Sequence, residues 1–354
     1  MKWFRKMIGA LVLLVMQSGA VCLAGNGNLL PADLLKAPEW PVTMTSFGGR
    51  LLLSDSPEIV PGDGIMYQDT VKGKTRLFFH HVNGTTEAKK IVVLLVNNND
   101  HAARVTVSQH GIAGPGGDYL AVGKAAQQEY LADSDLYLLD VPPHGTTLLA
   151  PVLNVVSVGP NMLLNGIYDF HTDRTLTVKV MMMPLAANVD DAASALTVLP
   201  TDRYRLRGTF DAPDRLVMPD KAYDGERDGP VAFTLADNRI DLYQKGIDAT
   251  DGSQTLNYGN YGVVYHLYIP SAHGGSLQVL MNPLGGEFAG AMGVKYNYAV
   301  NAPRPVPADK LFLGRDPQPQ LASIGTFAGG RSLWLTFSPP GASNLPVRLL
   351  IVPN

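Results

Sequence analysis

The chain has 354 residues, with 28 Lys and Arg against 31 Asp and Glu, and a formal net charge of −3. This balance excludes the strongly basic surface of a typical nucleic-acid-binding protein, and 46% hydrophobic with 17% charged residues excludes a wholly disordered chain. The 36 Gly and 26 Pro are dispersed, as in all-β proteins with many turns.

The first 24 residues have the order of a secretory signal peptide. Basic residues come first, followed by the apolar run Met7–Met16 and by small residues up to Ala24. The run is too short to span a membrane comfortably. We therefore expect cleavage before Gly25 and a Sec-exported bacterial protein, secreted or held in the cell envelope, with no transmembrane segment after cleavage.

Cys22 is the single cysteine, and it lies inside the expected signal peptide. Its removal leaves no disulfide and no cysteine-ligated metal site. Two alternatives stay open: retention of the segment as an uncleaved anchor, and attachment of a lipid at Cys22.

The remaining sequence divides into a leader segment at 25–47, which is polar and interrupted by proline, and two β-rich modules at 48–198 and 199–354. Short apolar strands between Gly- and Pro-rich turns predict a mostly β fold. We expect two β-sandwich modules in tandem, Ig-like or jelly-roll-like, with one short helix in the first.

In the first module we expect hairpin turns at Lys72–Lys74 and at His171–Asp173, each between two apolar strands. The apolar run Lys90–Val96 predicts a strand covered on both faces, and the alternation of Arg104–Gln109 predicts a strand with one wet face. Asp118–Leu131 is the predicted helix, with Asp118 as its cap. The residues expected to form its packing face are Tyr119, Leu120, Val122, Ala126, Tyr130 and Leu131.

The second module begins with a strand at 204–210 and ends with the apolar segment Val347–Pro353, which is expected to close a sheet. Between them, Asn301–Gln320 is rich in proline and shows too little periodicity for a regular element, so we expect a loop.

Histidine pairs raise the question of a metal. His80 and His81 are adjacent on a predicted strand and therefore point to opposite faces, so we expect one packed and one exposed histidine. A copper or zinc site formed by either of them with His101 or His110 across the sheet is the alternative. Asn97–Asp100 is expected to be a turn, with a calcium loop as its alternative. We predict no metal site and no cofactor.

Paired carboxylates would indicate a glycoside hydrolase, but the sequence does not pair them. The candidates border turns, where solvated carboxylates are the ordinary case, and they are Asp55, Asp69, Asp118, Asp140 and Asp169. No G-x-S-x-G motif marks a nucleophilic serine. The catalytic residues are therefore unknown.

Residues 256–270, LNYGNYGVVYHLYIP, interleave tyrosine with asparagine. Aromatic faces and amide groups suit sugar rings or a peptide, through stacking and directed hydrogen bonds. The candidate ligand-binding residues are Asn257, Tyr258, Asn260, Tyr261 and Tyr265. The alternative is that Tyr265 and its neighbours are ordinary strand residues.

Several stretches resemble a family of exported bacterial envelope proteins with a tandem β-sandwich region. The similar stretches are GIMYQDTVKGKTRLFFHHVN, VVLLVNNNDHAARVTV, GIAGPGGDYLAVGK, NYGNYGVVYHLYIP and VLMNPLGGEFAGAMGVKY. Members often carry an added copper amine oxidase N-terminal-like domain, whose name reflects fold and implies no oxidase activity. We see no such domain in this sequence. The resemblance implies export and architecture, and it carries over no catalytic residue.

These observations favour a non-catalytic β-sandwich protein, secreted or held in the cell envelope, that binds an envelope polysaccharide or a protein partner. Nucleic acid is not expected as a partner. The alternative from another class is a secreted hydrolase or glycan-modifying enzyme whose carboxylates are brought together by the fold.

Overall fold

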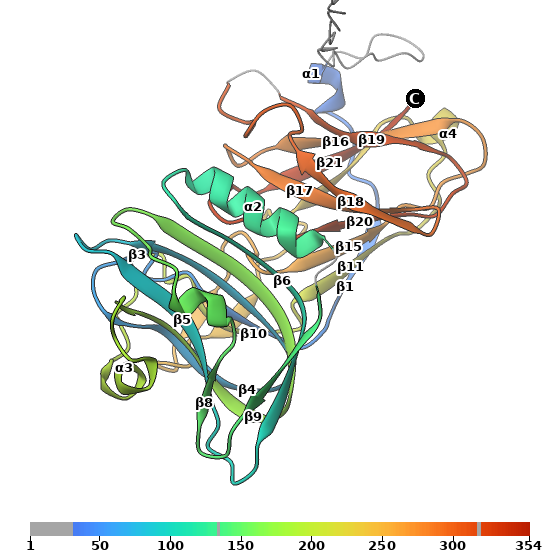
Figure 1. The fold of residues 1–354 in the computed structure, drawn as a ribbon. Helices are drawn as coiled ribbons and strands as arrows, with labels where there is room; N and C mark the ends of the chain where they lie inside the picture. Colours follow the sequence, from blue (N-terminus) through green and yellow to red (C-terminus); the bar gives the residue numbers. More distant parts are fainter. Residues whose placement is uncertain (1–30, 133–134, 317–319) are drawn as a thin grey trace, which may run out of the picture.

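The computed structural model describes residues 31–132, 135–316 and 320–354. The expected signal peptide and the first residues of the leader lie outside this part of the chain. The protein is mostly β and sandwich-like, as predicted, with its strands in three sheets (Figure 1). Within the described residues, no helix has the length and apolar character needed to cross a bilayer.

The largest sheet has eleven strands. In chain order they are β2 (Arg50–Ser54), β3 (Ile59–Val60), β4 (Gly64–Asn83), β5 (Lys89–Val96), β6 (Ala103–Gly116), β7 (Tyr137–Val141), β8 (Thr146–Leu148), β9 (Leu163–Pro184), β10 (Arg207–Asp211), β13 (Lys245–Ile247) and β14 (Gln254–Leu256). Its main path runs β14-β13-β10-β2-β4-β9-β5-β8, and β3, β6 and β7 join it at the side.

The two hairpins predicted in the first module are wrong, because β4 and β9 are single long strands of 20 and 22 residues that pair with each other. The expected turn at Lys72–Lys74 is a bulge, where the register shifts between Val71 and Gly73. Gly73 has a φ of +83°. Glycine signals a turn in a sequence, but a left-handed glycine also serves a bulge, which bends a strand without ending it.

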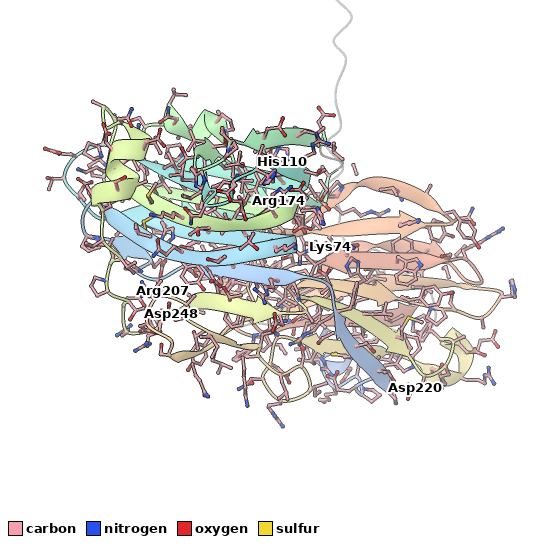
Figure 2. All side chains as sticks on the ribbon, turned by 90° about the horizontal axis from the view of Figure 1, so that it is seen from below. Lys74, His110, Arg174, Arg207, Asp220 and Asp248 are labelled. Atoms are coloured by element: carbon pink, nitrogen blue, oxygen red, sulfur yellow. The ribbon has the colours of Figure 1, made fainter. Side chains whose placement is uncertain are left out.

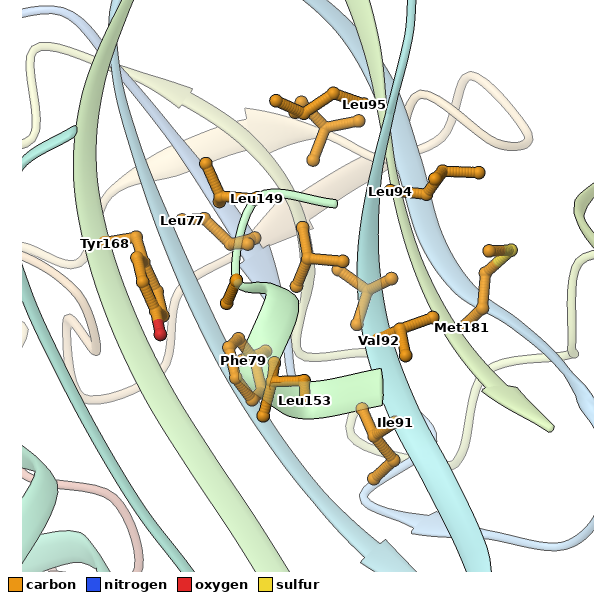
Figure 3. Close-up of a cluster of buried hydrophobic side chains, with 14 of the residues drawn as sticks. Leu77, Phe79, Ile91, Val92, Leu94, Leu95, Leu149, Leu153, Tyr168 and Met181 are labelled. Carbon is orange, nitrogen blue, oxygen red and sulfur yellow. The ribbon is translucent and has the colours of Figure 1, made fainter. Parts of the chain in front are cut away.

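The bends fold the largest sheet over a core of its own. β5 pairs with the second half of β9 and β6 with the first half, yet side chains from both, such as Val93 and Val105, meet in one buried cluster. Figure 3 shows part of this cluster, including Leu77 and Phe79 of β4 and the buried side chains of Leu149 and Leu153. The apolar run of β5 is buried along nearly its whole length, as predicted.

The other two sheets face each other and enclose a second core. The six-stranded sheet has the order β1-β11-β15-β20-β17-β18 and the four-stranded sheet the order β12-β21-β16-β19. The first contains β1 (Val42–Phe47), β11 (Asp214–Pro219), β15 (Val264–Tyr268), β17 (Gly290–Tyr296), β18 (Ala299–Val306) and β20 (Leu333–Phe337). The second contains β12 (Val231–Leu235), β16 (Ser276–Pro283), β19 (Ala322–Ala328) and β21 (Val347–Pro353). Leu267 of β15 and Ile351 of β21 are among the buried residues between them.

Strand β18 corrects the loop predicted for Asn301–Gln320, since Ala299–Val306 pairs with β17. β18 is the last strand of its sheet and contains Pro303 and Pro305. Proline lacks the N–H that a central strand needs, so a proline-rich segment can still form a strand at an edge.

Helix α2 (Tyr119–Leu131) is the predicted helix, and Asp118 caps it by accepting a hydrogen bond from the Ala121 N–H at 3.1 Å. The structure adds α1 (Pro31–Leu34), α3 (Val189–Ala195), α4 (Gly225–Asp228) and the 3-10 turn η1 (Pro151–Asn154), which were not predicted. The expected core residues Val122 and Ala126 of α2 are buried, and so are Lys124 and Gln127.

Strands from both sides of residue 198 share the largest sheet. β10 pairs with β2 along five residues, and Arg207 of β10 reaches the buried carboxylate of Asp248 at 2.7 Å and the backbone oxygen of Met66 in β4 at 3.1 Å (Figure 2). In the leader segment, β1 pairs with β11 in the six-stranded sheet. The division at residue 198 stays a prediction, and the sheets continue across it.

Side chains also tie the largest sheet to the six-stranded sheet. Arg76 of β4 is buried and donates to Asp169 of β9 at 2.6 and 2.9 Å and to Asp214 of β11 at 2.7 Å. Helix α2 lies along the same seam (Figure 1), where Lys124 donates to the oxygen of Pro307 at 2.8 Å. The side chain of Gln127 accepts the Ala291 N–H at Oε1, at 2.6 Å, and donates from Nε2 to the backbone oxygen of Ser338.

Candidate binding groove

Three of the five predicted ligand-binding residues are fully buried. Asn257, Asn260 and Tyr265 expose none of their surface. The Asn257 oxygen accepts the Tyr261 N–H at 2.9 Å and its amide donates to the Tyr261 oxygen at 2.8 Å, which closes the loop before β15. Asn260 donates to the Tyr265 hydroxyl at 2.9 Å, which donates to Asp241 at 2.6 Å. These side chains hold the loop in place and do not face solvent.

The other two predicted residues lie in different surroundings. Tyr261 is half-buried, and its hydroxyl donates to the Ser343 oxygen at 2.7 Å. Tyr258 is 51% exposed, and its ring meets the edge of Tyr243 at 6.0 Å between ring centres. The structure therefore does not bring the five residues together on one surface, and Tyr258 is the member most open to a ligand.

Tyr258 lines an open groove of about 650 Å³ over the end of the largest sheet. The floor comes from β10, β13 and β14, where Thr209 lies opposite Ile247 and Ile247 lies opposite Gln254. Paired residues of antiparallel strands project to the same face, so these side chains share one surface. The volume falls within the range of about 300–1,000 Å³ usual for ligand sites.

The turn Arg203–Arg205, which was not predicted as part of a site, also lines the groove. Asp202 holds this turn, because its carboxylate accepts the N–H groups of Tyr204 at 2.9 Å and Arg205 at 3.1 Å. The Arg203 guanidinium lies 4.5 Å from the centre of the Tyr204 ring and donates to its hydroxyl. Tyr204 is 53% exposed, so the groove carries two accessible aromatic rings.

Some charged side chains in the groove have an ion-pair partner and others do not. Arg205 pairs with Asp251 at 3.1 Å, and Asp211 pairs with Arg50 at 3.5 Å. Arg203 and Lys245 have no carboxylate partner within the part of the chain that the structure describes. The groove therefore has two cations whose charge no neighbouring acid offsets.

Both histidines of the adjacent pair are buried, so the expectation that one is exposed is wrong. His81 lies against Ser54 Oγ at 2.8 Å and the Pro57 oxygen at 3.0 Å, whereas His80 approaches Glu58 at 3.9 Å. Long strand β4 is covered on both faces here, which removes the wet face that a hairpin would leave. Burial lowers the pKa of His80 to about 3 and that of His81 to about 4.

No group of three or more His, Cys, Asp or Glu side chains among the described residues is arranged to hold a metal ion. At the expected turn, the Asn97 oxygen accepts the Asn99 N–H at 2.9 Å, as in a local turn. The absence of a metal in the protein stays a prediction.

Most of the carboxylates singled out in the sequence have structural partners. Asp118 caps α2, Asp169 binds Arg76, and Asp69 accepts from the Thr209 hydroxyl at 2.5 Å. Asp140 is exposed beside Arg104. Asp55 differs, because it is buried next to two other acids.

The acids beside Asp55 are Glu58 and Asp202. Burial, and then repulsion from Glu58 and Asp202, raises the pKa of Asp55 well above its usual range. Burial and Asp202 also raise the pKa of Glu58, whose side chain is partly exposed. Asp55 is therefore a sequence candidate for acid–base chemistry that lies among other carboxylates with no basic side chain paired to it in the described chain.

Comparison with known proteins gives no family. No family model matches the chain, and no curated protein matches it. Weak similarity exists to solved structures, among them the CUB1-EGF-CUB2 region of human MASP-1/3, with 10% identity and a TM-score of 0.20 over 78% of this chain and 99% of that one. The multicopper oxidase mgLAC has 11% identity and a TM-score of 0.13 over 84% of this chain and 75% of that one. PNGF-II has 10% identity and a TM-score of 0.17 over 89% of this chain and 66% of that one. Likeness at this level carries no argument, and membership in the exported envelope family stays a prediction.

Proposed function

We propose that the chain is a non-catalytic β-sandwich protein of the cell envelope that binds polysaccharide in the groove between Tyr204 and Tyr258. The observation that carries this proposal is the pair of half-exposed tyrosines over one sheet face. The apolar faces of sugar rings stack on aromatic side chains, and the polar groups of the floor supply hydrogen bonds. The signal-peptide pattern at the N-terminus supports a location where such polymers occur.

The test is retention of the purified protein by insoluble cell-wall polysaccharide. Tyr204→Ala and Tyr258→Ala are each expected to weaken retention by about fivefold, because each removes one stacking surface. Tyr298→Ala is the matched control, since Tyr298 is 80% exposed and lies outside the groove. Equal retention of the wild type and both groove variants would overturn the proposal.

The second candidate is a hydrolase, which the raised pKa values of Asp55 and Glu58 favour. A carboxyl group whose pKa is raised by burial and by neighbouring acids is better suited to act as a general acid than a solvated one. The measurement is release of reducing ends from a panel of polysaccharides. Activity of the wild type that is lost in Glu58→Gln supports this candidate, and a wild type without activity on the whole panel excludes it for those substrates.

A further inference from the structure

We infer that the polymer bound in the groove is an anionic polysaccharide, with a carboxylate or phosphate group on its sugar units. This inference rests on the proposed function and specifies the class of ligand. It depends on charge, whereas the proposed function depends on the aromatic rings, so the two can be tested separately.

The positive charge of the groove comes from Arg203 and Lys245. Both are exposed, and no carboxylate of the described chain neutralises either one. The nearby acids are already engaged: Asp211 pairs with Arg50, and Asp251 pairs with Arg205. Asp69 does not line the groove, and its carboxylate accepts a hydrogen bond from the hydroxyl of Thr209, which does.

The two cations line the same groove as the two aromatic rings. Arg203 lies over the ring of Tyr204, at 4.5 Å from its centre. Lys245 lies opposite Leu256, two positions before Tyr258 in the sequence, and both Lys245 and Tyr258 line the groove. The groove lining therefore combines two flat aromatic rings with two positive charges, one of which lies directly over a ring. A polymer that repeats a sugar ring and an acidic group along its length matches this arrangement.

The charge is local to the groove, because the whole chain has a formal net charge of −3. An acidic polymer would be repelled by the molecule as a whole and attracted at this surface. Such an arrangement favours binding in one place and discriminates against neutral chains of the same shape.

The experiment compares three anionic polysaccharides, polygalacturonate, alginate and hyaluronate, each with its neutral carboxyl-reduced form. The wild type is expected to bind the anionic forms about tenfold more tightly, which corresponds to two exposed ion pairs. In Arg203→Gln/Lys245→Gln this preference is expected to disappear, so that each anionic polymer binds no more tightly than its neutral form. Lys295→Gln is the control, because Lys295 is exposed on β17, away from the groove.

Binding of the wild type to neutral and anionic forms with equal affinity would overturn the inference and leave the proposed function in place. Absence of binding to all six polymers would overturn both. Retained preference for anionic forms in the double variant would assign the selectivity to other residues and overturn the inference. All three substituted positions are exposed, and an unchanged melting temperature confirms that each variant is folded.

Discussion

Arg76 of β4 links three strands, because its guanidinium also binds carboxylates of β9 and β11. It carries one positive charge between two carboxylates, Asp169 and Asp214, and it also donates to the Gly262 oxygen at 3.2 Å. The Tyr130 hydroxyl of α2 donates to the same Asp169 carboxylate at 2.9 Å. Removal of the buried guanidinium would leave two partly buried acids close together without a cation, which is more costly than loss of an exposed ion pair.

We predict that Arg76→Met lowers the free energy of unfolding by about 3–5 kcal/mol. Arg104→Met is the control, because the ion pair of Arg104 with Asp140 is exposed, with 3.8 Å between the charged atoms. Its effect is expected to stay within about 1 kcal/mol. Denaturation in urea, followed by tyrosine and tryptophan fluorescence, measures both. A loss below about 1 kcal/mol in Arg76→Met would show that the pair is not needed for stability.

His81 gives the protein a dependence on pH with a definite sign. Burial lowers the pKa of His81 in the folded protein to about 4, whereas the unfolded chain has the ordinary value of about 6.5. Between these two values the unfolded chain binds more protons, so stability falls as the pH falls through this window. Above it, the imidazole is neutral in both states and contributes no such loss.

We predict that acidification from about pH 7 to about pH 5 costs the wild type about 2 kcal/mol more than it costs His81→Gln. Glutamine keeps a polar group near Ser54 but takes up no proton. The measurement is the free energy of unfolding at both pH values, with His144→Gln as a control because His144 is exposed. Parallel losses in wild type and His81→Gln would be inconsistent with a buried neutral imidazole.

At the scale of single elements, α2 shows what local sequence can and cannot reveal. The cap at Asp118 and the apolar positions Val122 and Ala126 follow from short-range rules, and both were predicted. The burial of Lys124 and Gln127 was not, since it depends on carbonyl groups of residues 307–338 that the chain reaches much later. A polar residue on a helix face is ordinarily read as solvated.

We predict that Gln127→Ala lowers the free energy of unfolding by about 1–3 kcal/mol, because the buried N–H of Ala291 loses its acceptor. Gln128→Ala is a matched control on the same helix, since Gln128 is less buried and its side chain has no hydrogen bond within the described residues. Its effect is expected to be about 0.5 kcal/mol or less. Chemical denaturation compares the two, and equal effects would contradict the role given to Gln127.

The strands were recognised more readily than their ends. Apolar runs marked β5 and β21 correctly, but Gly73 inside β4 was taken for a turn, and Pro303 and Pro305 hid β18. In each case the residue type permits two backbone roles, and the pairing partner decides between them. That partner lies far away in the sequence.

The groove was predicted only through Tyr258. Its other members come from the turn Arg203–Arg205 and from strands β10, β13 and β14, so no single stretch contains the site. Amide groups also bind sugars, but both asparagines beside Tyr258 are buried and have partners inside the protein. Asn257 bonds to the backbone of Tyr261 in its own loop. Asn260 bonds to the backbone of Leu242 and Gln244 and to the Tyr265 hydroxyl. The local signal for the turn that lines the groove is a tyrosine between two arginines, Arg203–Tyr204–Arg205.

For the whole molecule, the decisive question is whether the two modules are separable. β2 lies between β4 and β10, and Arg207 of β10 donates to backbone oxygens of both Met66 and Leu199. A fragment that ends at residue 198 lacks β10, and it would expose Leu51 and Leu53, which are buried in the seam.

We predict that residues 25–198 alone do not unfold cooperatively, whereas the full chain unfolds in a single transition, because the sheets and the seam are continuous. Circular dichroism and calorimetry against temperature distinguish the cases. A sharp melting transition of the fragment, near that of the full chain, would show that the first module folds by itself.

The pairing of β2 with β10, and of β1 with β11, also sets an order in time. The ribosome makes β1 and β2 near the beginning of the chain, but their partners follow only after the whole of β4 to β9. Until then both strands have an open edge, which can pair with a strand of another molecule. Long-range pairing of this kind slows folding. The N-terminal strands of the newly made protein are therefore the ones that need protection from aggregation for the longest time, either by a low protein concentration or by a chaperone.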